Sequence, residues 1–157
     1  MCGRRSLESL AVTGPPLPVR WTVGTHLIAA LPDLLRAAQH TFDETGGLHA
    51  AGLFSTNADL ELSAEDVGRH NAVDKLIGRM LMRGRVPLNQ SLLFVSGRSS
   101  FEIIQKAFLG GIPLVAAVSA PSSLAVELAR ASGVTLLGFV RGGRFNVYTH
   151  PERVAAV

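Results

Sequence analysis

Residues 65–78, EDVGRHNAVDKLIG, place many ionisable side chains at the start of an apolar helical pattern. If a helix begins near Gly68, His70 and Asp74 lie one turn apart on the same face, so the aspartate could orient the imidazole. Alternatively the pair is structural, and Glu65 and Asp66 only complement the helix N-terminus. The spacing by itself favours the structural alternative.

Two serine-rich turns, residues 96–100 (SGRSS) and 119–123 (SAPSS), each precede a helix-like segment. Ser99 and Glu102 have the spacing of a capping box, and Pro121 stands where a first helical residue tolerates proline. Ordinary helix capping would explain both turns. Capping does not require a cation, however, and Arg98 in the first turn therefore favours an anionic ligand such as phosphate.

Cys2 is the one strong nucleophile, and it is followed by a glycine and two arginines. Nearby arginines stabilise a thiolate, and the glycine leaves access for a reaction partner, so reactive sulfur chemistry is one interpretation and an incidental cysteine is the other. A single cysteine excludes an internal disulfide or a multi-cysteine zinc site within this chain. The cysteine content fits a reducing cytoplasm.

A zinc-dependent hydrolase of the deaminase type would need His-x-Glu together with Cys-x-x-Cys. His49 has glycines on either side, which allow close backbone approach, but Ala50 and Ala51 follow it directly and there is no second cysteine. The sequence therefore disfavours catalytic zinc, and we expect no metal.

The composition, 157 residues with 47% hydrophobic side chains, is that of a chain with one substantial core. Its net charge is +3, but no run of basic residues or recognition helix suits nucleic acid. The uncharged stretch 107–126 contains glycines and prolines that would break a membrane-spanning helix, and no secretory signal is expected.

The apolar pattern predicts the elements that must position these side chains. Residues 13–23 are proline-rich and extended, residues 27–42 form a helix that stops at 45–47, and residues 50–55 and 60–62 form a hairpin. Apolar runs at 92–95, 114–118 and 135–140 alternate with helix-like segments 99–109 and 121–132, which is typical of a parallel sheet. Residues 144–149 follow a glycine pair as an antiparallel edge strand.

Six ungapped blocks of the sequence resemble one family. They are CGRRSLESL at 2–10, TGGLHAAGLF at 45–54, EDVGRHNAVDKLIG at 65–78, SGRSSFEIIQKA at 96–107, PLVAAVSAPSSLAVELA at 113–129 and GFVRGGRFNVYTHPERV at 138–154. Together they resemble the C-terminal domain of the FdhD family, the formate dehydrogenase accessory proteins that act as sulfurtransferases.

The resemblance implies a three-layer α/β fold with a mostly parallel sheet and helices on both faces, cytidine deaminase-like but without zinc. It divides the chain into residues 1–24, a cysteine-loop remnant with an extended arm, and residues 25–157, the α/β domain. It also implies a homodimer, while the composition given above indicates a cytoplasmic protein that binds neither nucleic acid nor membrane.

The resemblance further implies that a cysteine desulfurase loads sulfur as a persulfide, which is delivered to the molybdenum cofactor of formate dehydrogenase. That cofactor is Mo-bis-molybdopterin guanine dinucleotide, for which GDP is a mimic. The residues implied to bind it are Phe139, Val140, Arg141, Gly142, Gly143 and Arg144, with Ser96, Gly97, Arg98, Ser99, Ser119 and Ser122 as pocket walls and Asp66, Arg69, His70 and Asn71 as the pocket floor or the receiver of the persulfide loop.

The chain departs from the family pattern at its cysteine loop, Cys-Gly-x-Cys-Gly. Cys2 and Gly3 match the second half of that loop, and the first cysteine is not in this sequence. We therefore expect Met1 to lie inside a longer protein and leave open whether Cys2 or the missing cysteine carries the persulfide. Two alternatives to a sulfur carrier are a chaperone that presents the cofactor and a zinc-dependent nucleobase hydrolase.

Overall fold

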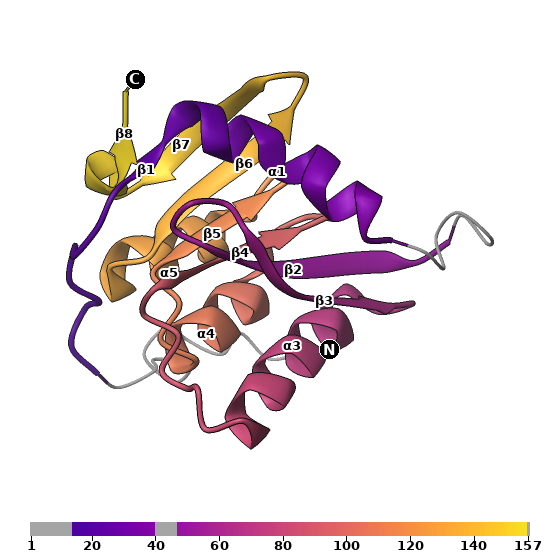
Figure 1. The fold of residues 1–157 in the computed structure, drawn as a ribbon. Helices are drawn as coiled ribbons and strands as arrows, with labels where there is room; N and C mark the ends of the chain where they lie inside the picture. Colours follow the sequence, from indigo (N-terminus) through magenta and orange to yellow (C-terminus); the bar gives the residue numbers. More distant parts are fainter. Residues whose placement is uncertain (1–13, 40–46, 157) are drawn as a thin grey trace, which may run out of the picture.

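The computed structural model describes residues 14–39 and 47–156, which form one sheet of six strands with helices on both sides (Figure 1). The order across the sheet is β3-β2-β4-β5-β6-β7, and a separate two-stranded sheet pairs β1 with β8. The strands are β1 (Val23–Gly24), β2 (His49–Ser55), β3 (Leu60–Asp66), β4 (Ser91–Val95), β5 (Leu114–Ala117), β6 (Thr135–Arg141), β7 (Arg144–Thr149) and β8 (Val154–Ala155).

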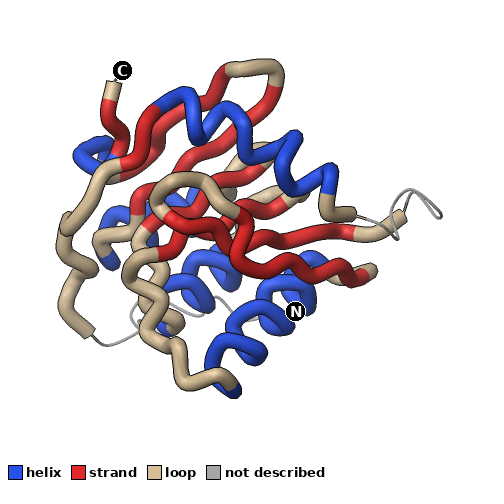
Figure 2. The backbone as a smooth tube through the Cα atoms, in the orientation of Figure 1, coloured by secondary structure: helices blue, strands red, loops and turns tan. Residues whose placement is uncertain are grey.

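The helices are α1 (Thr25–Ala37), α3 (Arg69–Met82), α4 (Phe101–Leu109) and α5 (Ser123–Ser132), with a short 3-10 turn at Pro151–Arg153. Helix α1 covers one face of the sheet, and α3, α4 and α5 cover the other (Figures 1 and 2). The predicted three-layer fold is therefore confirmed. No helix in the described part of the chain is long and apolar enough to cross a membrane.

Strands β4, β5 and β6 pair in parallel, as predicted, and α4 and α5 are the crossovers that parallel neighbours need. Strands β2 and β3 form the predicted hairpin, and β2 joins β4 antiparallel. Strand β7 adds antiparallel to β6. The sheet is thus mixed: β3, β4, β5 and β6 run in one direction, and β2 and β7 run in the other.

The central strands are apolar on both faces because helices cover both. In β4, Leu93 and Val95 pack into the core under α3, α4 and α5, whereas Leu92 and Phe94 pack into the core under α1. Side chains alternate between the faces of a strand, so a continuous apolar run is what a doubly covered strand requires. Edge strand β3 is half-buried and correspondingly mixes polar with apolar residues.

Two helix boundaries differ from the sequence-based expectation. Helix α1 ends at Ala37 rather than reaching Phe42, and residues 40–46 lie outside the described part of the chain. Pro121 precedes the cap of α5 instead of forming its first turn, because Ser122 is the N-cap and its hydroxyl accepts the N–H of Ala125. Helix α3 begins beside Gly68 as predicted.

The proline-rich arm is extended, as predicted, and lies along the edge where the parallel strands begin, at the left of Figures 1 and 2. Leu17 N–H donates to the Ser132 carbonyl (2.9 Å), just before β6, and the Trp21 indole donates to the Asn89 carbonyl (2.7 Å), just before β4. The arm is therefore bound to the body of the molecule from Leu17 onward.

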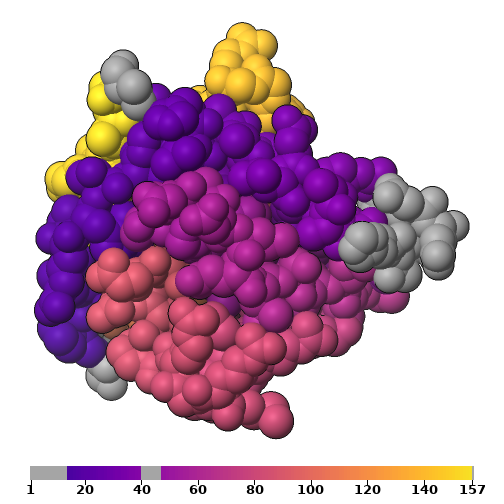
Figure 3. All heavy atoms as spheres, viewed as in Figure 1, coloured from indigo at the N-terminus to yellow at the C-terminus, as the bar shows by residue number. Residues whose placement is uncertain are grey.

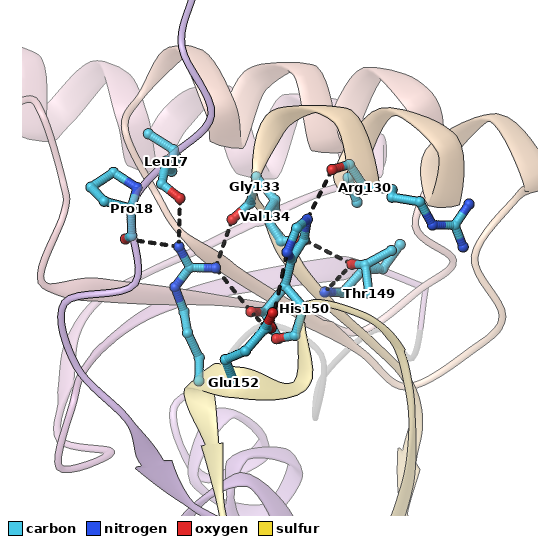
Figure 4. A network of polar contacts seen from close by, with 12 residues as sticks. Leu17, Pro18, Arg130, Gly133, Val134, Thr149, His150 and Glu152 are labelled. Atoms are coloured by element: carbon cyan, nitrogen blue, oxygen red, sulfur yellow. Dashed lines mark hydrogen bonds and ion pairs between the residues drawn. The ribbon is translucent and has the colours of Figure 1, made fainter.

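Arg153 holds the arm from inside the molecule, and Figure 4 shows three of the residues whose carbonyls it binds, Leu17, Pro18 and Gly133, close together. The Arg153 side chain is fully buried, and its guanidinium donates to the carbonyls of Gly133 (2.6 Å), Leu17 (3.0 Å) and Pro18 (2.9 Å) and to the Thr135 hydroxyl (3.0 Å). Burial lowers the pKa of this guanidinium below its usual value. The edge of the sheet that carries the arm is called the arm edge below.

Candidate functional site

The opposite edge, here called the rim, gathers the residues that the sequence singled out. Strands β4, β5 and β6 run parallel, so the segments that follow them emerge at the same edge. The antiparallel partners bring the start of β2, the end of β3 and the start of β7 to the same place. The rim consists of His49, residues 66–71, residues 96–100, residues 119–122 and residues 139–144.

Asp66 organises the loop that leads into α3. Its carboxylate accepts from the Gly68 N–H (2.9 Å), the Asn71 amide (3.2 Å) and the Lys75 ammonium (2.7 Å). The hydrogen bond from Lys75, followed by those from Gly68 and Asn71, lowers the pKa of Asp66 to about 2. Asp66 therefore stabilises the start of α3, which agrees with the hypothesis that part of the charged stretch 65–78 has a structural role.

His70 has different partners from the one its spacing suggested. The imidazole Nε2 lies 2.8 Å from the Ser100 hydroxyl and Nδ1 lies 3.1 Å from a Glu102 carboxylate oxygen, both on the neighbouring turn and helix. Asp74 instead accepts a 2.6 Å ion-pair hydrogen bond from Lys106 of α4. The expected His70–Asp74 pair is wrong, because both residues face α4 and each finds its partner there.

Gly97 allows two cationic or titratable side chains to approach the first serine-rich turn. A Cβ at this position would lie 3.3 Å from His49 Nδ1 and 3.7 Å from the Arg69 Cδ. Arg69 also carries a buried Nε that has no hydrogen-bond partner among the described residues. The contacts around Gly97 thus join β2, α3 and the turn after β4 at one point of the rim.

The serines of the first turn do separate jobs. The Ser96 hydroxyl accepts the Ala50 N–H (2.9 Å) and so fastens the turn to β2, while Arg98 is exposed. Ser100, rather than Ser99, is the N-cap of α4, with its hydroxyl accepting the Ile103 N–H. The predicted capping box is therefore wrong by one residue, and Ser99 is buried with a hydroxyl that has no partner in the described residues.

Backbone hydrogen bonds tie the two turns to the β6–β7 hairpin. Ser122 N–H donates to the Ser99 carbonyl (3.0 Å), and Phe139 N–H donates to the Ser119 carbonyl (3.2 Å). Phe139 has a φ of 53°, a left-handed conformation, and lies at a register shift in β6. The rim is therefore a connected structure rather than a set of independent loops.

The hairpin tip is the most open part of the rim, and Figure 3 shows it projecting above the surface. Arg141 and Arg144 are exposed register partners, and the Arg141 guanidinium lies 5.3 Å from the centre of the Phe139 ring. Gly142 and Gly143 have positive φ and nothing within 4 Å of an added Cβ. Val140 is fully buried, and its side chain packs into the core under α1.

Several predicted features remain predictions. Cys2 lies outside the described residues, so its position relative to the rim is not part of the structure. In residues 14–39 and 47–156 no group of three or more His, Cys, Asp or Glu side chains could hold a metal ion. Sequence reasoning missed the link of His70 to Ser100 and Glu102, since thirty residues separate His70 from Ser100 and no local pattern marks them as partners.

Comparison with known proteins gives consistent results across sequence and structure. A family model described as the FdhD/NarQ family matches residues 1–155. A curated protein of Streptomyces avermitilis named sulfur carrier protein FdhD is 54% identical over 163 residues, covering 99% of this chain and 56% of that protein. The chain thus spans somewhat more than half the length of the curated relatives it matches.

Two solved structures illustrate the range of the fold. A protein of Desulfotalea psychrophila assigned as a formate dehydrogenase accessory protein superposes with a TM-score of 0.80 at 34% identity, over 90% of this chain and 60% of that one. A guanine deaminase of Nitrosomonas europaea superposes with a TM-score of 0.59 at 12% identity, over 87% and 91%. The second likeness concerns the fold alone and agrees with the expected deaminase-like architecture.

Proposed function

The chain belongs to the FdhD/NarQ family, and on that premise we propose that it acts as a sulfur carrier, which takes persulfide sulfur from a cysteine desulfurase and delivers it to formate dehydrogenase. The acceptor is the molybdenum cofactor of that enzyme, Mo-bis-molybdopterin guanine dinucleotide. In this proposal the rim holds the cofactor, and a cysteine-loop thiol brings the sulfur.

The observation that carries the proposal is the open, arginine-flanked hairpin tip joined to the two serine-rich turns. Because Gly142 and Gly143 have no side chain and open space around them, a phosphate or purine can lie against their backbone. Arg141 and Arg144 offer planar donor forks that match phosphate oxygens. Stacking of Arg141 beside the Phe139 ring holds one of these forks on the hairpin.

GDP binding tests this part of the proposal, since GDP corresponds to one arm of the cofactor. We expect the double variant Arg141→Ala/Arg144→Ala to lose about tenfold or more in GDP affinity by titration calorimetry, since tenfold corresponds to about 1.4 kcal/mol. The matched control is Arg130→Ala, which removes an exposed arginine side chain at the end of α5. Equal GDP affinities in the wild type, the double variant and Arg130→Ala would exclude the hairpin as the nucleotide site.

Sulfur transfer is tested separately, in a form of the protein that carries both loop cysteines. Incubation with a cysteine desulfurase and cysteine is expected to add one sulfane sulfur to the loop, detected by mass spectrometry of the intact protein. Variants that replace Cys2 or the first loop cysteine by alanine show which thiol carries it. A loop that never gains sulfur would contradict the carrier proposal.

A cofactor-binding chaperone is the second candidate, and one observation favours it. The rim consists of groups that suit binding, such as the exposed side chains of Arg141 and Arg144 beside the Gly142–Gly143 pair. A chaperone would bind GDP normally and support formate dehydrogenase after both loop cysteines are replaced. A homodimer, a cytoplasmic location and direct contact with formate dehydrogenase are further parts of the proposal, and sedimentation analysis tests the first.

A further inference from the structure

The imidazole of His70 connects a serine hydroxyl to a carboxylate across two helix starts. Nε2 lies 2.8 Å from Ser100 Oγ and Nδ1 lies 3.1 Å from Glu102 Oε2. The side chain of His70 is 33% exposed and that of Glu102 is 61% exposed, so the chain of hydrogen bonds is accessible at the rim. Hydroxyl, imidazole and carboxylate in this order form the arrangement that moves protons in many hydrolases and transferases.

The hydrogen bonds assign the protons. Ser100 Oγ accepts the Ile103 N–H as the cap of α4, so the hydroxyl proton is free to be donated to Nε2 of His70. Nδ1 then carries the imidazole proton and donates it to Glu102. The carboxylate therefore fixes the tautomer in which Nε2 is the acceptor, and a proton that reaches Ser100 can pass on to His70.

The neighbouring charges leave Glu102 as the carboxylate that pairs with His70. Asp74, on the same helix, is paired with Lys106 of α4, and Asp66, at the end of β3, is paired with Lys75. On the other side of the first turn, Arg69 and His49 lie beside Gly97. Among the described residues, the ion pair of Glu102 is the one with His70, at 3.1 Å.

Two polar atoms beside the hydrogen-bonded series Ser100–His70–Glu102 are buried without partners among the described residues. They are the Ser99 hydroxyl, whose residue is 1% exposed, and Arg69 Nε. Ser99 directly precedes Ser100 in the sequence, and Arg69 directly precedes His70. Unsatisfied buried polar groups are costly, so their presence on both sides points to a polar group that binds at this place.

We infer that Ser100, His70 and Glu102 form an acid–base relay for thiol–persulfide exchange at the rim. This inference rests on the proposed function. An incoming thiol gives its proton through Ser100 to His70, and the thiolate attacks the sulfane sulfur of the donor persulfide. A new S–S bond forms, the donor S–S bond breaks, and its electron pair leaves on the donor thiolate, which recovers the proton from His70. No electrons or protons are gained overall.

Capping alone does not account for the arrangement. The start of α4 needs only the Ser100 hydroxyl as an acceptor, and this role is filled without His70 or Glu102. In the relay Ser100 contacts the reacting thiol, His70 holds the proton, and Glu102 is a positioning residue. The relay lies on the same rim as the Phe139–Arg144 hairpin, so sulfur would be received next to the place proposed for the cofactor.

The test measures single-turnover transfer of sulfane sulfur from a desulfurase persulfide, from pH 5 to 9, in the form with both loop cysteines. His70→Asn keeps a polar side chain but cannot hold the proton, and we expect at least tenfold slower transfer. The rate–pH profile of the His70→Asn variant should differ from that of the wild type, because only the wild type has the imidazole as a proton acceptor. Glu102→Gln should slow transfer less, and GDP affinity should stay unchanged in both.

Two control variants match these changes. His26→Asn alters an exposed histidine on α1, and Glu127→Gln alters an exposed glutamate on α5, and both should transfer within twofold of wild type. Because Glu102 is largely exposed, its variant should fold normally. Unchanged rates and pH profiles in the His70 and Glu102 variants would overturn the relay and leave the carrier function standing. Failure of the unaltered protein to take up sulfur would overturn both.

Discussion

The two edges of the sheet use arginine in opposite ways. At the arm edge, Arg153 is fully buried and makes four hydrogen bonds to carbonyl and hydroxyl oxygens. At the rim, Arg141 and Arg144 are exposed, and Arg69 has a buried Nε without a partner in the described residues. The arm edge satisfies both terminal nitrogens of its guanidinium from within the chain and leaves only the buried Nε of Arg153 without a partner among the described residues, whereas the rim keeps the exposed donors of Arg141 and Arg144 available for a ligand.

The difference follows from the cost of burying charge. Desolvation of a guanidinium is unfavourable unless acceptors replace the lost water, and the arm supplies two of the four acceptors of Arg153. An exposed guanidinium carries no such cost and contributes little to stability. Substitutions at the arm edge should therefore change folding, and substitutions at the hairpin tip should change binding.

The largest expected effect is that of Arg153→Ala. The variant leaves the Gly133 carbonyl and the Thr135 hydroxyl without this donor and releases the arm, which we expect to cost about 3 kcal/mol of unfolding free energy. Urea unfolding followed by circular dichroism measures the loss. The fluorescence of Trp21, the single tryptophan, reports separately on the arm.

Two further variants sharpen this contrast between the edges. Arg153→Lys keeps the charge but cannot reproduce the planar fork, so we expect it to recover only part of the stability. Arg144→Ala, at the exposed tip, should change the unfolding free energy by less than about 0.5 kcal/mol. Equal destabilisation by Arg144→Ala and Arg153→Ala would contradict the division of roles.

A smaller effect is expected from Gly138→Ala, which tests how tightly the rim is built. A Cβ at Gly138 would lie 2.8 Å from the Tyr148 ring, 3.0 Å from Pro121 Cδ and 3.2 Å from the Ser119 carbonyl oxygen. We expect a loss of about 1–3 kcal/mol from overpacking, together with weaker GDP binding because the second turn is displaced. Thermal unfolding and calorimetry measure the two quantities.

The matched control for this prediction is Gly78→Ala in α3. A Cβ at Gly78 meets nothing within 4 Å, and alanine favours the helix by about 0.5–1 kcal/mol over glycine. The two glycine substitutions should thus have opposite signs. A stabilising Gly138→Ala would mean that the contact between the hairpin and the second turn is looser than the structure has it.

The smallest effect concerns the pH dependence of the α3 start. Because the folded-state pKa of Asp66 is about 2, below the ordinary value of 3.8, its contribution to stability is present above pH 3.8 and is lost as the pH falls toward 2. The side chains of Asp66 and Lys75 are 21% and 44% exposed, so solvent screening keeps this contribution small.

The measurement compares wild type with Asp66→Asn between pH 5 and pH 2. The variant should be less stable at pH 5, and the difference should shrink as the pH falls through the range in which the wild-type carboxylate takes up a proton. High salt should reduce the difference further. A constant difference down to pH 2 would show that the ion pair with Lys75 does not cause the stabilisation.

Much of the fold could be predicted from the sequence because the spacing of apolar residues shows which faces of each strand and helix are buried. The runs that form β4, β5 and β6 are apolar on both faces, and the helices between them are apolar on one face. This pattern predicted that the three strands form a parallel sheet covered by helices. Helix ends were less certain, since capping depends on local geometry. The cap of α4 is Ser100 although Ser99 has equally suitable chemistry, and only backbone position separates them.

The sequence by itself determined the order of strands and helices, the turns at one edge of the sheet and the residue types gathered there, because these depend on periodicity and on short-range chain geometry. The tertiary structure alone decided which side chains meet. His70 binds Ser100 and Glu102 rather than Asp74, and Arg153 binds Leu17 across 136 residues. Such partners depend on the relative orientation of packed elements, which the spacing within a single element does not contain.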